Sequence, residues 1–347
     1  MVSPKTLLGN INKIPQFADM LQYLIIQLCD TSTSFCHYDN DKLEPRLINL
    51  DDLKKGIKFA MKQNLMIQFL YPNYVLPAQY KDVIDSIDHN DIVPSTCEDT
   101  LLRDNADIVV ISDWKTLCYY NFRADSIYVL RTSKADLFDR YQFIKDTLKK
   151  VYRLNIVLTD TDSFKEPDYK KYNQILSVLA DEVAESFYNG HGVQLNVLTD
   201  RIVLDRMNNC EAGSSHLTLA PDGKLYVCPA FYAEQKNAQD EKYSEYDYCI
   251  GEPQNEVSIP NANLYKLEYS PLCRTCDAYH CKRCVWLSKK LTLEVNTPSH
   301  EQCVISHLER NMSRSLLDKI RNSNENLSDI EILPIDYLDP FNNRKEW

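Results

Sequence analysis

Glycine is scarce in this sequence, at 7 of 347 residues. Phosphate-binding motifs such as GxGxxG and the Walker A loop need several closely spaced glycines, and neither motif is present. The HExxH motif of zinc proteases and the GxSxG motif of serine hydrolases are also missing. These absences exclude the nucleotide-binding and hydrolase classes that the motifs define.

Long apolar runs and an excess of positive charge are absent too. No segment approaches the ~20 apolar residues of a membrane-spanning helix, and mean hydropathy is -0.41. Residues 1–20 hold no apolar stretch followed by small residues, so we expect no secretion signal. The net charge of -11 argues against nucleic acid as the main partner, because phosphate binding needs a basic face. We therefore expect a soluble, cytoplasmic protein with neither a membrane nor a nucleic acid as partner.

Cysteine, in contrast, is concentrated in one part of the chain. Eight of the twelve cysteines lie between 210 and 303, and four of them lie in "SPLCRTCDAYHCKRCVWLS" (270–288). Their spacing is CxxCxxxxCxxC over 273–284. In a reducing compartment clustered thiols hold metal more often than they form disulfides. Four thiolates at this spacing suit tetrahedral Zn²⁺ or an iron–sulfur cluster.

The first 200 residues alternate short apolar runs with amphipathic segments. Strands are predicted at 23–28, 65–70, 106–113, 126–131, 154–159 and 193–199, and helices at 49–64, 78–87, 134–152 and 168–188. Strands this apolar indicate a parallel sheet covered by helices, either doubly wound or a full or partial barrel.

Polar residues follow the predicted strands, at the ends where such folds carry their chemistry. They are Cys29-Asp30-Thr31, Asp113, Arg131-Thr132-Ser133, Thr159-Asp160-Thr161-Asp162 and Thr199-Asp200. The same residue types are also typical of helix caps, so either interpretation is open.

The pattern changes after residue 200. The segment 216–232 alternates around Pro221-Asp222-Gly223, which predicts a β-hairpin. A polar loop without periodicity is expected at 233–262. A final helix is predicted at 299–320, where Ser299 and Gln302 fit a capping box.

Further cysteines extend the cysteine pattern on both sides. Cys210, Gly223 and Cys228 precede the four-cysteine stretch, and Cys303 follows it in the first turn of the last predicted helix. This arrangement resembles the SPASM region of peptide-modifying radical SAM enzymes, which reads C-x9–15-G-x4-C, then CxxCx5Cx3C, then a last C. The middle part departs from the family, with four and two intervening residues where the family has five and three.

The resemblance implies which cysteines would bind metal. One auxiliary [4Fe–4S] cluster would take Cys273, Cys276, Cys281 and Cys303, and a second would take Cys210, Cys228 and Cys284. Cys249 is either a fourth ligand of the second cluster or a bystander. Because the middle part is short, a single zinc at 273, 276, 281 and 284 is an open alternative. The expected cofactors are therefore iron–sulfur clusters or zinc.

The first half lacks the residues of a SAM site. Radical SAM enzymes carry CxxxCxxC after the first strand, but "CDTSTSFCHYDN" (29–40) puts Ser32, Cys36 and Asp39 at the three positions. The GGE turn that usually follows the second strand is replaced by "LYPNYVLP" (70–77). Serine and aspartate are poor replacements for thiolate ligands of iron. SAM is therefore not expected as a cofactor, although a fold can persist without its site.

This combination resembles the CXXX-repeat peptide maturase family, over about residues 20–320. The resemblance implies an α/β fold: a radical SAM-like partial (β/α) barrel lacking CxxxCxxC, followed by a small cysteine-rich SPASM-like domain. The expected boundaries are an N-terminal extension at 1–19, the α/β domain at 20–200, the SPASM-like metal-binding domain at 201–322 and a C-terminal tail at 323–347.

The same resemblance implies the maturation of a ribosomally made, cysteine-rich (CXXX-repeat) precursor peptide. That peptide is the expected partner, together with other proteins of the maturation system. Cys36 is the candidate catalytic thiol, because it lies in a loop at the expected barrel mouth; a buried structural thiol is the alternative. A non-enzymatic peptide-binding scaffold with a four-cysteine zinc site is the alternative function. Basic residues at 282–283 and 289–290 also suggest a nucleic-acid-binding zinc ribbon, which the acidic composition opposes.

Overall fold

The computed structural model describes residues 21–40, 43–238, 248–255, 257–321, 327 and 329–334. The expected extension at 1–19 lies outside the described residues, as does most of the expected tail at 323–347. The described strands form one ten-stranded sheet, in the order β10-β9-β8-β1-β2-β3-β4-β5-β6-β7. All neighbours from β8 to β7 pair in parallel, and β9 pairs antiparallel with both β8 and β10.

The strands have the following bounds: β1 Tyr23–Gln27, β2 Met66–Leu70, β3 Asn90–Pro94, β4 Ile108–Ile111, β5 Ile127–Thr132, β6 Arg153–Leu158, β7 Gln194–Leu195, β8 His216–Leu219, β9 Leu225–Tyr226 and β10 Cys249–Gly251. The α-helices are α1 Leu50–Gln63, α2 Ala78–Ile84, α3 Thr100–Asn105, α4 Trp114–Tyr119, α5 Lys134–Leu148, α6 Glu166–Tyr188, α7 Asn196–Val203, α8 Pro229–Ala238, α9 Val285–Thr292 and α10 His300–Ile320. Short 3₁₀ helices lie at Thr161–Ser163, Ala262–Tyr265 and Leu267–Tyr269.

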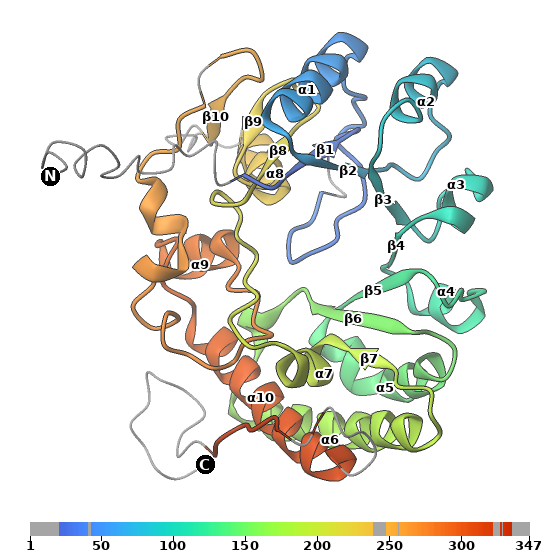
Figure 1. The fold of residues 1–347 in the computed structure, drawn as a ribbon, viewed down its shortest axis with the longest axis vertical. Helices are drawn as coiled ribbons and strands as arrows, with labels where there is room; N and C mark the ends of the chain where they lie inside the picture. The colour runs from blue at the N-terminus through green and yellow to red at the C-terminus, as the bar shows by residue number, and fades with distance from the viewer. Residues whose placement is uncertain are drawn as a thin grey trace, which may run out of the picture.

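The parallel strands follow an arc, and α1 to α6 cover its outer side (Figure 1). Leu24 and Ile26 of β1 belong to the large core under these helices. Ile25 lies on the other, inner face of the sheet, in a row that crosses five strands. The row consists of Ile25, Leu70, Ile92, Val110 and Val129. Side chains alternate between the two faces of the sheet, and both faces are covered. The sequence of each strand is therefore a continuous run of apolar residues.

Most of the predicted elements are confirmed within one to three residues at each end. The predicted strand at 193–199 is wrong beyond Leu195, where α7 begins. Asn196 explains the early end, because its side-chain amide replaces backbone pairing with β6. Its Oδ1 accepts from the Ile156 N–H (2.8 Å) and its Nδ2 donates to the Ile156 carbonyl (3.0 Å). The loop expected at 233–262 contains the end of α8 and all of β10.

The C-terminal part packs back onto the arc. The predicted hairpin is present, with β8 and β9 joined through Gly223, whose φ of 81° suits a residue without a Cβ. Helix α10 lies against α6 and α7 (Figure 1). Its start is capped as predicted, with the Ser299 Oγ accepting from the Gln302 N–H (3.2 Å).

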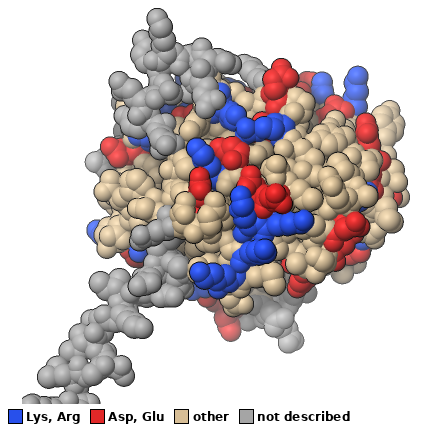
Figure 2. All heavy atoms as spheres, turned by 90° about the horizontal axis from the view of Figure 1, so that it is seen from above, with Lys and Arg blue, Asp and Glu red and all other residues tan. Residues whose placement is uncertain are grey.

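In the described part of the chain, no helix is both long enough and apolar enough to span a bilayer. Figure 2 shows one face of the molecule, on which Lys and Arg side chains lie among Asp and Glu side chains.

Candidate functional site

The segment after β1 runs inside the arc; residues 28–40 are named the β1 loop (Figure 1). Its far end is fixed to β5 and β6. The Arg131 guanidinium donates from Nε to the Cys36 carbonyl (2.9 Å) and from Nη2 to the Tyr38 carbonyl (2.5 Å). The His37 Nδ1 lies 2.8 Å from the Leu158 carbonyl oxygen, at the end of β6. The loop thus spans the inside of the barrel from its first strand to its sixth.

The near end of the β1 loop is held by polar side chains of its own. The Ser32 Oγ accepts from the Cys29 N–H (2.9 Å) and donates to the Leu70 carbonyl (2.8 Å) at the end of β2. The Asn40 amide donates to the carbonyls of Asp30 and Ser32 (2.8 and 2.7 Å). Ser32 occupies the first of the three ligand positions of the radical SAM motif, and its hydroxyl is fully engaged in fixing the loop.

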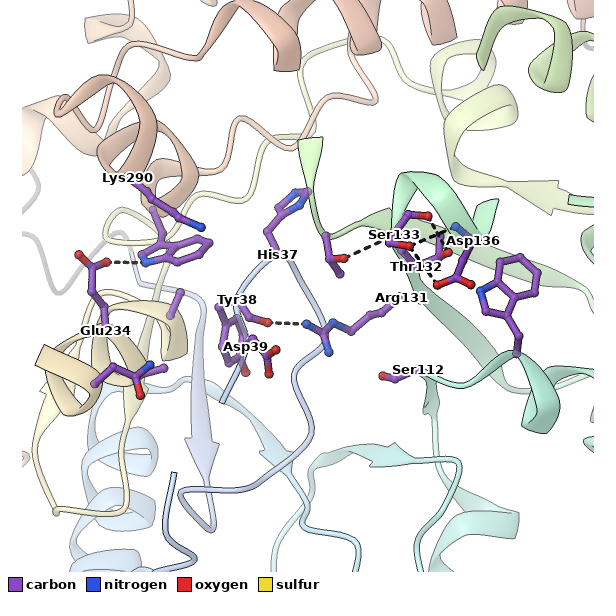
Figure 3. A pocket seen from close by; sticks show the side chains of 16 residues that line it. His37, Tyr38, Asp39, Ser112, Arg131, Thr132, Ser133, Asp136, Glu234 and Lys290 are labelled. Atoms are coloured by element: carbon purple, nitrogen blue, oxygen red, sulfur yellow. Dashed lines mark hydrogen bonds between the residues drawn. The ribbon is translucent and has the colours of Figure 1, made fainter. Parts of the chain in front are cut away.

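A cavity of about 620 Å³ lies at the carboxyl ends of β4, β5 and β6. One wall is made by the strand ends, including Ser112, Thr132 and Thr159, and by residues 37–39 of the β1 loop. Figure 3 shows Arg131 reaching from the strand side toward this loop. The predicted location of chemistry at the strand ends therefore coincides with a real cavity.

The opposite wall comes from α8 and α9. The Trp286 indole donates from Nε1 to the Glu234 carboxylate (2.6 Å), and the Lys290 Nζ lies 5.2 Å from the Trp286 ring centroid (Figure 3). The wall thus combines an aromatic surface with charges of both signs. Trp286 and Lys290 were predicted only as part of a possible nucleic-acid-binding ribbon, and Glu234 was not predicted. Trp286 and Lys290 are four residues apart, a spacing that places two side chains on the same face of a helix.

Some of the polar residues at the strand ends cap the following helix, and others line the cavity. Asp113 caps α4, because its carboxylate accepts from the N–H groups of Lys115 and Thr116. Ser133 caps α5 by accepting from the Asp136 N–H (3.1 Å), and its side chain also lines the cavity. Capping therefore explains some of these residues, and the cavity wall explains others.

Three predicted ligands are close enough to affect one another's pKa; Cys210, Cys228 and Cys284 are named the sheet-edge thiols. Burial raises the pKa of the Cys228 thiol well above its usual range, and negative charge on Cys284 and Cys210 raises it further. The N–H groups of Phe231 and Ala230, at the start of α8, oppose this shift. Similarly, the Cys284 Sγ accepts from the Leu287 N–H at the start of α9 (3.4 Å). Helix starts of this kind stabilise a thiolate.

Three other predicted ligands lie together in the 270–284 segment; Cys273, Cys276 and Cys281 are named the segment thiols. Burial raises the pKa of Cys273 to about 12, with contributions from Cys281 and Cys276. The Cys276 Sγ accepts from the Ala278 N–H (3.4 Å) and lies 3.4 Å from the His307 Nε2 on α10. Negative charge on Cys281 also raises the pKa of Cys284, so this group of thiols adjoins the sheet-edge thiols.

Helix α10 presents one face to the segment thiols. Burial raises the pKa of Cys281, and a hydrogen bond with the Ser306 side chain opposes the shift. Ser306 and His307 follow Cys303 by three and four residues, so all three share one face of α10. The sequence prediction of Cys303 as a ligand is therefore compatible with its place on the helix.

Arg283 lies between the two thiol groups. It is 1% exposed, and its guanidinium donates to the Ser270 Oγ (2.8 Å) and to the Tyr265 carbonyl (2.6 Å). Burial lowers its pKa, while negative charge on Cys273 and Cys210 raises it. Its Nε is buried without a hydrogen-bond partner. A buried cation needs anionic neighbours, and sulfur ligands of both groups can provide them.

The two remaining candidate thiols lie apart from each other. Cys249 is on β10, where its Sγ lies 3.5 Å from the Gly251 carbonyl oxygen and its side chain packs beside Tyr226. Cys36 belongs to the β1 loop but is absent from the cavity lining. A direct action of Cys36 on a molecule in the cavity stays a prediction.

Within the described residues, no three His, Cys, Asp or Glu side chains are grouped as the ligands of a single metal ion would be. The sulfurs around one Zn²⁺ bind at about 2.3 Å, which puts them about 3.8 Å apart in a tetrahedron. The ligands of a cluster bind different iron atoms and can stand further apart.

Comparisons with known proteins show likeness of fold. No family model and no curated protein sequence matches the chain. Among solved structures, anSMEcpe with bound AdoMet has a TM-score of 0.57 at 13% identity, covering 89% of this chain and 97% of that chain. Two structures of anSMEcpe with AdoMet and a peptide, Cp18Cys or Kp18Cys, give TM-scores of 0.53 and 0.55 at 14% identity, each covering 88% of this chain and 99% of that chain. The chain therefore has the α/β fold of a radical SAM-like partial barrel, as predicted.

Proposed function

We propose that this protein matures a ribosomally made, cysteine-rich precursor peptide, which it binds in the cavity at the ends of β4, β5 and β6. The hydrogen bond from the Cys210 N–H to the Lys282 carbonyl (2.7 Å) carries the proposal, because it brings Cys210 next to the segment that bears Cys281 and Cys284. The fold provides further support, since solved structures of the similar anSMEcpe contain bound peptides.

The donor atoms fit iron–sulfur clusters. The sheet-edge thiols would hold one cluster, and the segment thiols with Cys303 would hold the other. Backbone N–H groups point at the sulfurs of Cys228, Cys276 and Cys284, as they do around metal-bound thiolates. The buried Arg283 offsets negative charge on both sides. When bound, such clusters would supply one-electron transfer next to the peptide.

The β1 loop does not fit the cluster that binds SAM. Of its three ligand positions, Ser32 is engaged with backbone groups, Cys36 is the one thiol, and Asp39 is an exposed carboxylate. Soft iron prefers thiolate, so these residues make a poor site. We propose chemistry that does not cleave SAM, although AdoMet is bound in the similar solved structures.

The cavity suits a peptide segment with small side chains. Its walls offer the Trp286 ring for apolar contact, with Glu234 and Lys290 as charged groups at its edge. Asp39 lies on the opposite wall, so both ends of a short peptide segment can meet polar groups. Specificity for a CXXX repeat and the participation of other maturation proteins remain predictions from the resemblance.

Binding of a synthetic peptide tests this proposal. We expect a CXXX-repeat peptide to bind the anaerobically purified protein, and the same peptide with every cysteine changed to serine to bind at least tenfold more weakly. Trp286→Ala should weaken binding by about tenfold, because it removes the aromatic wall and the Glu234 contact. Tyr119→Ala is the matched control, since this ring is 90% exposed and absent from the cavity lining.

Mass spectrometry of the peptide after incubation with the protein and a one-electron donor or acceptor tests for maturation. A mass change that requires intact metal supports the proposal. Equal binding of both peptides, or binding unaffected by Trp286→Ala, would contradict it. Binding without any mass change, together with one zinc and no sulfide per chain, would instead establish the scaffold alternative.

A further inference from the structure

Among the described residues, two tryptophan side chains line the cavity, and they differ in the state of their indole N–H groups. The Trp286 N–H donates to the Glu234 carboxylate at 2.6 Å. Trp114 is only 5% exposed, and its N–H is buried with no hydrogen-bond acceptor among the described residues. Of the two indoles, Trp114 is therefore the one whose donor the described protein leaves unpaired.

An unpaired buried donor is unfavourable for a folded protein. The group has lost its hydrogen bonds to water and has gained none in return. Such groups are uncommon in native structures, so each one needs an explanation. A ligand that supplies the missing acceptor recovers the lost free energy when it binds. The Trp114 N–H is thus suited to recognise a hydrogen-bond acceptor on a molecule in the cavity.

The fold fixes the place of the Trp114 ring. Trp114 is the first residue of α4 and follows the cap residue Asp113, whose carboxylate accepts from two N–H groups of the first turn (3.2 and 3.1 Å). Helix α4 packs against α5, on which Ser133 and Asp136 lie side by side at the cavity (Figure 3). Because the ring already lines the cavity, a small side-chain movement of the kind common in binding brings its N–H to the ligand.

The charges of the cavity lining favour a neutral acceptor. The charged lining residues are Asp39, Asp136, Glu234, Arg131 and Lys290. Arg131 already donates to two main-chain carbonyls of the β1 loop, and the Lys290 ammonium lies over the Trp286 ring on the other wall. An anionic group at Trp114 would meet the Asp136 carboxylate of the neighbouring helix without a cation beside it. A neutral carbonyl oxygen avoids this repulsion.

We propose that the Trp114 N–H donates a hydrogen bond to a main-chain carbonyl of the bound precursor peptide. The inference rests on the proposed function and adds the residue that positions the peptide chain in the cavity. Every residue of a peptide carries a main-chain carbonyl, so this contact holds the chain whatever residues separate the cysteines. Trp286 supplies apolar contact from the α9 side, and Trp114 fixes the position of the chain from the strand side.

Trp114→Phe tests the proposal, because it keeps an aromatic ring and removes the N–H. We expect the synthetic CXXX-repeat peptide to bind this variant about three- to tenfold more weakly than the wild-type protein, which is the contribution of one neutral hydrogen bond. Tyr119→Phe should bind the peptide with unchanged affinity. It is the matched control, since Tyr119 belongs to the same helix, is 90% exposed and is absent from the cavity lining.

A set of peptides in which one amide at a time is replaced by an ester locates the carbonyl. An ester carbonyl is a weaker acceptor than an amide carbonyl, so one replacement should weaken binding to the wild-type protein more than the others do. In Trp114→Phe the loss of affinity from that replacement should be at least twofold smaller. The comparison of both proteins with both peptides isolates the contact between the indole and the carbonyl.

UV resonance Raman spectroscopy gives a measurement on the protein with its Trp114 side chain intact. The chain has three tryptophans, at 114, 286 and 347, and Trp347→Phe removes one of the three signals. Trp286 is already paired with Glu234. Saturation with the peptide should therefore shift the band that reports indole hydrogen bonding toward a stronger bond, and Trp114→Phe should abolish this shift.

The outcomes separate the inference from the proposed function. Equal affinity of the wild-type protein and a folded Trp114→Phe variant would overturn the inference, as would a Raman band that the peptide does not move. Equal effects of every ester replacement in the two proteins would also overturn it. In these cases the peptide still binds, so the proposed function stands. Failure of the peptide to bind the wild-type protein would refute both. If circular dichroism shows that Trp114→Phe is unfolded, the Raman shift decides.

Discussion

Replacing Arg131 with methionine should release the far end of the β1 loop. The guanidinium makes two charge-assisted hydrogen bonds to loop carbonyls, at 2.9 Å to Cys36 and 2.5 Å to Tyr38. Each such bond contributes about 1.5–3 kcal/mol, so the pair contributes about 3–6 kcal/mol before the cost of desolvating the guanidinium. With about 1–3 kcal/mol of this offset by desolvation, we expect local opening of the loop to become about 2–3 kcal/mol easier.

Hydrogen exchange read by mass spectrometry measures this change directly. A loss of 2–3 kcal/mol corresponds to opening that is about 30- to 150-fold more frequent, so amides of residues 36–40 should exchange faster by that factor. Arg131→Lys is the matched variant, because an ammonium keeps the charge but lacks the planar fork that reaches both carbonyls. We expect about a tenfold increase with lysine.

Exchange elsewhere decides whether the effect is local. Amides of α1 and of β5 itself should change less than twofold in both variants. Unchanged exchange at residues 36–40 in Arg131→Met would refute the reasoning, because the loop would then be held by other contacts. The single bond from His37 to the Leu158 carbonyl is the principal candidate for such a contact.

Three further perturbations test other parts of the account. Cys276→Ser should lower bound metal by at least half and lower the thermal midpoint of the C-terminal part, because metal binding contributes to folding; unchanged metal content would refute its role as a ligand. Gly56→Ala should destabilise the protein by about 1–3 kcal/mol in urea, because the new Cβ would lie 2.2 Å from the Leu219 Cδ2 in the packed core; a change under about 0.5 kcal/mol would show that Leu219 can yield. Asp91, whose Oδ1 lies 3.4 Å from the His89 Nε2, raises the pKa of His89 to about 9, so this pair stabilises the fold fully below pH 6.5 and stops doing so as the pH rises through 9. His89→Gln should therefore cost about 1–2 kcal/mol at pH 6 and nothing at pH 10, and a cost independent of pH would contradict the assignment.

The fold was largely predictable because apolar runs buried on both faces leave a clear signal. The runs that became β1, β2, β5 and β6 follow from this pattern, as do the long amphipathic helices between them. The strand predicted at 193–199 was wrong because its apolar residues fit a strand and a buried helix equally well. Asn196 ends the pairing through its side chain, a role that residue type alone does not reveal.

The candidate site was predictable in part. The spacing of the cysteines indicated metal ligands, and a shared metal centre at Cys210, Cys228 and Cys284 stays a prediction. The course of the β1 loop was not predictable, because the loop crosses the barrel and is fixed by Arg131. The α8 and α9 wall of the cavity was missed for a similar reason. Its residues meet only through tertiary packing, far apart along the sequence.

The content of iron and acid-labile sulfide per chain, measured after anaerobic purification and reconstitution, tests the central claim most directly. Two cysteine-ligated [4Fe–4S] clusters predict about eight iron and eight sulfide per chain, with a brown protein. One zinc per chain without sulfide would contradict the account, because the sheet-edge thiols would then hold no cluster.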